Sequence, residues 1–152
     1  MLVKDIMTCN ARTVHPDTQL SEAASTMCLY RFSGLPVVED GKLVGFVAEK
    51  DILHRLFPSM EDWAQGSSTV DYDAITAEYK NVGQLKVREV MTPRVISVSP
   101  DMHALRAAAV MVANRFRRIP VADNGVLRGM ISLGDVHKAI FQHNVNTMFA
   151  LK

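Results

Sequence analysis

The chain has 152 residues, of which 48% are hydrophobic and 22% charged, and its formal net charge at pH 7 is +1. This length suits one domain, or two small halves that share a core. A charge near zero gives no general attraction to nucleic acid or anionic membrane, so we expect neither as a partner, and any anion site must come from locally clustered bases. The first residues lack a signal-peptide pattern and no apolar run approaches the ~18 residues that span a bilayer, which predicts a cytoplasmic protein.

The chain begins with a pattern that predicts a short strand followed by a helix. Residues 12–15 are extended up to Pro16, because the residue before a proline avoids helical geometry. Asp17 or Thr18 can cap the helix that follows. One face of this helix carries apolar residues at helical spacing. These residues are Leu20, Ala23, Ala24, Met27 and Cys28.

A hairpin and a second helix come next. The apolar runs 35–38 and 43–47 flank the turn sequence at 39–42, which is typical of a β-hairpin. A helix is then predicted from near Glu49. The element order of this first part is therefore β-α-β-β-α.

Residues 54–86 interrupt the pattern. Pro58 and Gly66–Ser68 punctuate this segment, and three apolar residues within it have helical spacing. We expect a partly helical connector whose acidic residues form a solvated face. The three apolar residues are Tyr72, Ile75 and Tyr79.

The second half of the chain repeats the first at a constant shift of 84 residues, as Met7 with Met91 and Asp51 with Asp135 illustrate. The matches fall on turn and core residue types, which indicates two copies of one supersecondary unit. The turn of the second copy, Asn124-Gly125, favours a hairpin even more strongly. We predict an α/β (α+β) fold in which the two copies share one core. The predicted division is 1–57 for the first repeat, 58–86 for the connector, and 87–152 for the second repeat with a helical tail.

Ser132 and Asp135 follow Gly129 at the point where a strand gives way to a helix. One interpretation is a helix cap, in which Ser132 accepts from a free amide and Asp135 complements the helix dipole. The other is a binding site, because the same amides attract an anion and a carboxylate can accept from a ribose diol. The first copy keeps Asp51 but has Ala48 in place of the serine, so the two copies should differ in binding.

Three arginines precede the last predicted strand pair. Arg115 is expected at a helix end, where Arg31 repeats it in the first copy. Arg117 and Arg118 have no such counterpart, and guanidinium geometry suits a phosphate. Since neighbours in an extended chain point to opposite faces, only one of these two should face a bound anion.

No pattern in the chain predicts catalysis. The five histidines lack metal-ligand spacing, and no serine or cysteine lies in a nucleophile elbow, so we predict neither catalytic nor metal-binding residues. Cys9 and Cys28 are expected to be small buried hydrophobes. The tail carries an apolar stripe that could cover the core or meet a second chain. This stripe consists of Phe141, Val145, Met148 and Phe149.

Two copies of Met-Thr, V-x-P-D, an alanine-rich helix, a Leu/Ile-Pro-Val strand and a terminal G-x-x-S-x-x-D pattern resemble tandem cystathionine-beta-synthase (CBS) domains, the pair called a Bateman module. The resemblance covers residues 3–53 and 87–140. It implies a regulatory module, not an enzyme, with two repeats about a pseudo-twofold axis. Such modules hold AMP, ADP or ATP, and sometimes S-adenosylmethionine, in clefts between the repeats.

The resemblance also implies which residues form the site. Asp135 would bind the ribose and Ser132 would lie near ribose and phosphate, with Met130 against the base and Arg117 or Arg118 toward the phosphate. The other repeat would contribute the far wall, made of Met7, Thr8, Phe32 and Ser33. A second, weaker site would use Asp51 beside Ala48.

The leading hypothesis is therefore a sensor that binds an adenosine nucleotide, needs no cofactor, forms a homodimer and regulates an unknown protein. S-adenosylmethionine is the less favoured ligand. The alternative is a ligand-free dimerisation module in which Ser132 is only a helix cap.

Overall fold

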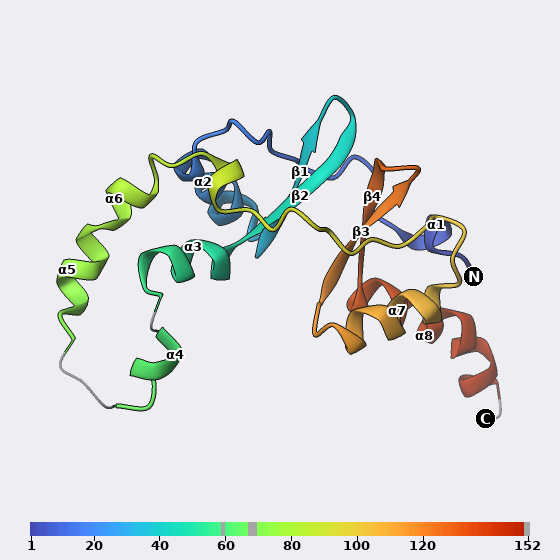
Figure 1. Cartoon of the computed structure of the whole chain (residues 1–152). Helices are drawn as coiled ribbons and strands as arrows, with labels where there is room; N and C mark the ends of the chain where they lie inside the picture. Colours follow the sequence, from blue (N-terminus) through green and yellow to red (C-terminus); the bar gives the residue numbers. More distant parts are fainter. Residues whose placement is uncertain (59, 67–69, 151–152) are drawn as a thin grey trace. The chain divides into compact units, whose positions relative to one another are not determined.

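The computed structural model of the chain describes residues 1–58, 60–66 and 70–150 (Figure 1). The chain divides into two compact units, each of which is described by itself. The first unit is Arg12–Val95, and the second combines Met1–Ala11 with Ile96–Lys152. Both units contain helices and an antiparallel hairpin, so the predicted α+β fold is confirmed.

The first unit contains the hairpin of the first repeat together with the connector. The extended piece before Pro16 is reduced to one parallel bridge, between Val14 and Val37. The helices and strands of this unit are α2 (Leu20–Tyr30), β1 (Gly34–Glu39), β2 (Lys42–Ala48), α3 (Glu49–Leu56), α4 (Met60–Trp63), α5 (Tyr72–Ala77), α6 (Tyr79–Val82) and the 3-10 turn η1 (Val87–Glu89). The segment between α3 and η1 thus contains the short helices α4, α5 and α6.

The second unit repeats this order without a connector. Its parallel bridge joins Val98 to Val121, the positions equivalent to Val14 and Val37. Its elements are α1 (Val3–Ile6), α7 (Ala104–Ala113), β3 (Arg118–Asp123), β4 (Val126–Ser132) and α8 (Leu133–Phe149). The β-α-β-β-α order predicted for each copy is confirmed, with the first strand shortened to a single bridge.

The two hairpins have the same turn and the same irregularity. Asp40-Gly41 and Asn124-Gly125 all have φ between 51° and 79°, the conformation that two-residue hairpin turns require. The register of each hairpin shifts once, after Val37 in the first and after Val121 in the second. Sequence repetition therefore extends to the detail of the backbone.

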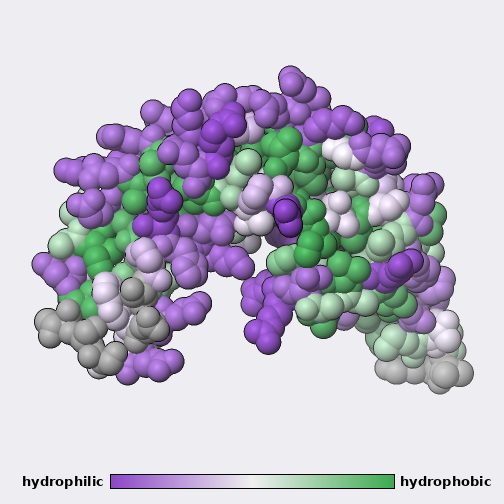
Figure 2. Space-filling model, viewed as in Figure 1, coloured by the Kyte–Doolittle hydropathy of each residue, from purple (hydrophilic) through white to green (hydrophobic). Residues whose placement is uncertain are grey.

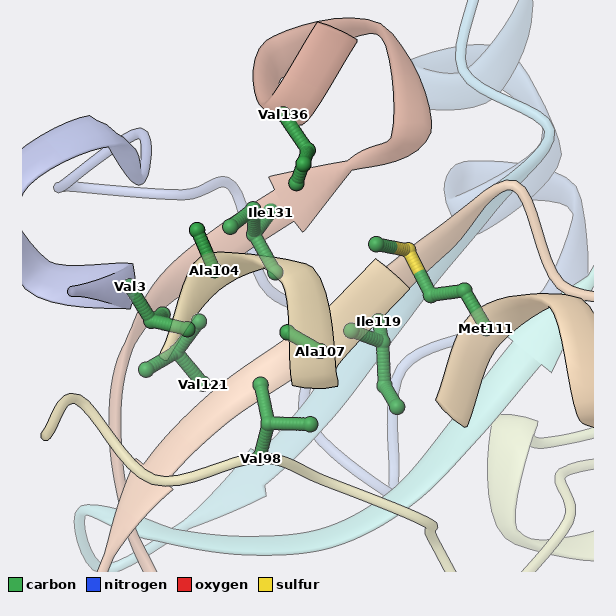
Figure 3. Close-up of a cluster of buried hydrophobic side chains, with 9 residues drawn as sticks. All are labelled: Val3, Val98, Ala104, Ala107, Met111, Ile119, Val121, Ile131 and Val136. Carbon is green, nitrogen blue, oxygen red and sulfur yellow. The ribbon is translucent and has the colours of Figure 1, made fainter. Parts of the chain in front are cut away.

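Each unit has its own apolar core, so the prediction of one core shared by the two copies is wrong. In the second unit, α7 and α8 both pack on the hairpin β3–β4, and the side chains meet as Figure 3 shows. That core consists of Val3, Val98, Ala104, Ala107, Met111, Ile119, Val121, Ile131 and Val136. The core of the first unit consists of Leu20, Ala23, Met27, Leu35, Val37, Val47, Ile52 and Val87.

The two copies exchange their leading segments. Thr8, from the start of the first copy, pairs with Met130 in β4, with N···O distances of 2.8 and 2.9 Å. Thr92, its equivalent in the second copy, pairs with Phe46 in β2 at 2.8 and 3.0 Å. Each core therefore contains one residue from the opposite copy: Val3 in the second unit and Val87 in the first.

Three sequence predictions about local structure need correction or refinement. Neither Asp17 nor Thr18 caps α2: the N-cap is Gln19, which makes no side-chain cap bond, while Thr18 accepts from the backbone N–H of His15. Cys9 and Cys28 were predicted to be buried, but both are exposed. The tail is helical to Phe149, as predicted, but Phe141, Met148 and Phe149 are exposed and do not cover the core of their unit.

Candidate functional site

The junction of β4 and α8 forms a reciprocal cap. The Ser132 backbone N–H donates to Asp135 Oδ2 at 2.9 Å, and the Asp135 N–H donates to Ser132 Oγ at 3.0 Å. The sequence predicted this cap as one of two interpretations. Its geometry fixes the Asp135 carboxylate at the positive end of a 17-residue helix.

The cap uses only part of the hydrogen-bond acceptor capacity of the Asp135 carboxylate. Only Oδ2 is used by the cap, and within the described residues Asp135 has no second hydrogen bond and no ion pair. Asp135 and Ser132 are half-buried, so their remaining acceptor positions are reachable from solvent. The cap and a binding role are therefore compatible, because a carboxylate offers about four acceptor positions.

The strand register decides how the two arginines lie. Arg118 is the first residue of β3 and lies directly opposite Ser132, and Pro120 lies opposite Met130. Alternate residues of a strand share a face, so Arg118, Met130 and Ser132 lie on one face of the hairpin, while Ile119 points into the core. Arg118 thus shares the face of the cap.

Arg117 has a different role in the fold. It precedes β3, and its carbonyl accepts a hydrogen bond of 2.9 Å from the Leu133 N–H in the first turn of α8. Its side chain is exposed. Arg115, as predicted, ends a helix, where its φ of 58° matches the 56° of Arg31 in the first copy. Of Arg117 and Arg118, only Arg118 pairs with Ser132 in the β3–β4 hairpin.

Met7 and Thr8 reach the same junction because the leading segments are exchanged. Thr8 pairs with Met130, and a Cβ at Gly129 would collide with the Thr8 carbonyl oxygen and lie 3.3 Å from Met7 Sδ. Only glycine therefore allows this approach. This role of Gly129 was not predicted from the sequence, although the repetition of the glycine as Gly45 is a signal for it.

Phe32 and Ser33, the remaining predicted wall residues, belong to the first unit. Phe32 stacks on Tyr30 with 5.9 Å between ring centroids, and the Ser33 carbonyl accepts from Glu49 N–H at 2.9 Å. Their part in a site with Ser132 stays a prediction.

The equivalent junction of the first unit is a reduced version of the site. The Ala48 N–H donates to Asp51 Oδ2 at 2.8 Å, but Ala48 has no hydroxyl to complete the exchange. Gly34 stands where the second unit has Arg118, and the Phe46 ring occupies the space a side chain at Gly34 would need. This junction therefore lacks both the hydroxyl and the cationic side chain.

The described part of the chain holds no group of three His, Cys, Asp or Glu side chains that could bind a metal ion. Among the helices of residues 1–58, 60–66 and 70–150, none has the length and apolarity needed to cross a bilayer.

The chain is similar to known proteins over most of its length. The family model described as CBS domain matches residues 3–58 and 87–142. The protein MJ1426 of Methanocaldococcus jannaschii is 35% identical, over 92% of this chain and 91% of its own. The CBS domain-containing protein YhcV of Bacillus subtilis is 34% identical, over 88% and 81%.

A solved structure of similar fold contains a nucleotide. The crystal structure of CBSX2, a protein of Arabidopsis thaliana, in complex with AMP has a TM-score of 0.72 to this chain at 28% identity. The match covers 94% of this chain and 98% of that chain.

Proposed function

Because the chain belongs to the CBS domain family and carries the domain as a tandem pair, we propose that it is a regulatory module that binds AMP, ADP or ATP. The β4–α8 junction of the second unit is the proposed site. The similarity to CBSX2, whose crystal structure contains AMP, supports this ligand class. S-adenosylmethionine is a less favoured ligand, because its sulfonium would lie near Arg118 and repel it.

The observation that carries the proposal is the placement of Arg118 on the same hairpin face as the Ser132–Asp135 cap. In the proposed complex, the free acceptor positions of Asp135 take the ribose hydroxyls. Arg118 and the Gly134 amide in the first turn of α8, whose neighbours at Leu133 and Asp135 are already bonded, then bind phosphate, because a guanidinium and a helix N-terminus both favour an anion. Met130 and Met7 supply polarisable surface for the base.

The proposed action is regulation by binding and not catalysis. A ligand changes the state of such a module only through different affinities for two arrangements of its parts. The module is proposed to act as a homodimer.

Thermal unfolding with added AMP, ADP, ATP or S-adenosylmethionine tests the proposal. A nucleotide at 100 times its dissociation constant should stabilise the protein by about 2.7 kcal/mol. The Asp135→Ala protein should lose this gain, whereas Asp51→Ala should keep most of it. Both variants remove a carboxylate that accepts from a helix-start amide, so the ligand-induced gain is compared and not the melting temperature alone.

Absence of a gain with all four ligands would refute the proposal. A stable dimer without any nucleotide effect would instead favour the alternative, a ligand-free dimerisation module. The exposed apolar side chains of α7 and α8 are the observation that keeps this alternative open.

A further inference from the structure

The segment between α3 and η1 lies outside the part of the chain that matches the CBS domain, since the matched residues end at 58 and resume at 87. Helix α6 is nevertheless part of the fold of the first unit: Val82 packs against its core, and the Gly83 carbonyl accepts from the Ser21 N–H of α2 at 2.9 Å. Among the described residues of α4 and α5, none belongs to this core or to the apolar residues packed against it. The core of the unit therefore does not account for α4 and α5.

Helices α4 and α5 are joined to the end of α3 by three aromatic side chains. The centroid of the Phe57 ring lies 4.0 Å from that of Trp63 in α4 and 6.2 Å from that of Tyr72 in α5, which it meets edge-on at 83°. Phe57 and Trp63 are half-buried, and Tyr72 is 60% exposed. We call these three residues the aromatic cluster; its ring contacts hold the two helices together, but it stays partly open to solvent. Figure 2 shows hydrophobic residues beside hydrophilic ones in the region of α5.

The aromatic cluster is accompanied in the sequence by acidic residues. Residues 60–79 contain five of them and neither lysine nor arginine, although the whole chain has a net charge of +1. The Glu61 side chain is 90% exposed, and its carboxylate lies 4.0 Å from His54 Nε2, the outer limit of an ion pair. Asp71 and Asp73, on either side of the third aromatic residue, are exposed, and Asp73 has no hydrogen bond or ion pair to the described residues. The negative charge beside the aromatic cluster is therefore not neutralised within its own segment.

This combination of rings and carboxylates restricts the kind of partner that fits the surface. Aromatic side chains are enriched in protein–protein interfaces, and a cation over the face of tryptophan or tyrosine is attracted by the ring. Acidic side chains repel nucleic acid and anionic lipid, which carry the same sign of charge. Symmetric pairing of the surface with itself in a second copy would also bring two acidic segments together. A segment in which apolar side chains are interspersed with lysine or arginine complements both the rings and the carboxylates.

We propose that the aromatic cluster and the acidic residues beside it bind a basic segment of another protein, one that carries apolar side chains among its lysines or arginines. Trp63 and Tyr72 contact the apolar side chains of this segment, and Glu61, Asp71 and Asp73 pair with its cationic groups. The surface belongs to the first unit and contains none of the residues of the proposed nucleotide site. The proposal therefore stands or falls separately from the proposed function.

Trp63 is the only tryptophan of the chain, so its fluorescence reports directly from the aromatic cluster. The probe is a synthetic amphipathic peptide of leucine and lysine, added to the full chain. Binding should shift the Trp63 emission to shorter wavelength and saturate, with a dissociation constant that rises with salt because the contact is partly ionic. A peptide with glutamate in place of every lysine, and one with serine in place of every leucine, should each bind at least about tenfold more weakly. No shift with the leucine–lysine peptide, or an equal shift with the leucine–glutamate peptide, overturns the proposal.

Matched variants test whether the peptide binds at this surface. Tyr72→Ser, and Glu61→Gln combined with Asp73→Asn, should each raise the dissociation constant of the leucine–lysine peptide about threefold or more, whereas Tyr72→Phe keeps the ring and should bind like the wild type. The control Glu22→Gln combined with Glu49→Gln, which neutralises two exposed acids of α2 and α3, should change the constant by less than about twofold. Circular dichroism establishes that each variant is folded. An equal loss in the control overturns the proposal, and so does an emission shift produced by raising the protein concentration without peptide, because a second copy then covers the aromatic cluster.

Discussion

Asp17 and Arg88, 71 residues apart, form a two-contact ion pair in the first unit: Asp17 Oδ1 lies 2.8 Å from Arg88 Nε and 2.7 Å from Nη2. The second unit has the equivalent pair, with Lys4 Nζ 2.7 Å from Asp101 Oδ1. In each unit the aspartate belongs to one copy and the base to the leading segment of the other. The repeated Pro-Asp sequence therefore helps to hold the exchanged segment in place.

This relationship predicts a pH-dependent effect of Arg88→Ala. The hydrogen bond from Arg88 lowers the pKa of Asp17, so the pair stabilises the fold at neutral pH and its contribution is lost as pH falls below the ordinary aspartate range, about 4. Urea unfolding should show Arg88→Ala less stable than wild type at pH 7, with a smaller difference at pH 3. The matched control is Arg94→Ala, which removes an exposed arginine of the same unit. An undiminished difference at pH 3 would contradict this assignment.

The contact between Gly129 and Thr8 predicts a position-specific cost for alanine. A methyl at Gly129 collides with the Thr8 carbonyl, which is backbone and cannot move aside, so Gly129→Ala should destabilise the protein by about 1–3 kcal/mol. At Gly45 the closest atom is the side-chain sulfur of Met91, so alanine there should cost less. Gly134→Ala meets only Ser132 Oγ at 3.6 Å and should be neutral or stabilising by up to about 1 kcal/mol. Denaturant unfolding of the three variants measures this order, and equal losses at Gly129 and Gly134 would refute it.

Much of the local structure was predictable because it depends on local chemistry. Asp40-Gly41 and Asn124-Gly125 adopt the turn that their sequences favour, and α3 and α8 begin where predicted. The pairing of Thr8 with Met130 was implied only by the family resemblance, because equivalent segments carry equivalent hydrogen-bonding groups and the residues alone do not tell which copy each segment will join. The exposure of Cys28 was missed for a related reason: helical spacing places it at the edge of the apolar face, and only the fold shows that edge turned toward Tyr79.

The sequence predicted that Ser132 and Asp135 lie together at a helix start, but it did not predict the geometry around them. Ser132 and Asp135 were placed together by their spacing, whereas the choice between two neighbouring arginines needed the strand register. That register puts Arg118 opposite Ser132 and leaves Arg117 outside β3.

The two arginines should therefore differ in nucleotide binding. Arg118→Ala should weaken nucleotide binding by about tenfold or more, since a hydrogen bond to a charged group contributes about 1.5–3 kcal/mol. Arg117→Ala removes the same charge outside the strand and should have a smaller effect. Isothermal titration calorimetry of both variants measures the difference, and a larger loss for Arg117→Ala would reverse the assignment.

The hydroxyl of the cap can be removed from the second repeat and introduced into the first by substitutions at Ser132 and Ala48. Ser132 and Ala48 have nearly the same backbone geometry, with φ of −117° and −120° and ψ of 161° and 159°. Ser132→Ala should cost about 1 kcal/mol by removing the acceptor for the Asp135 amide. Ala48→Ser should gain a similar amount, because Asp51 already accepts from the Ala48 N–H and the new hydroxyl completes the exchange. Urea unfolding measures both changes. If Ala48→Ser brings no gain, the hydroxyl of Ser132 is not a stabilising cap acceptor in this fold, which would leave ligand binding as the reason for the serine.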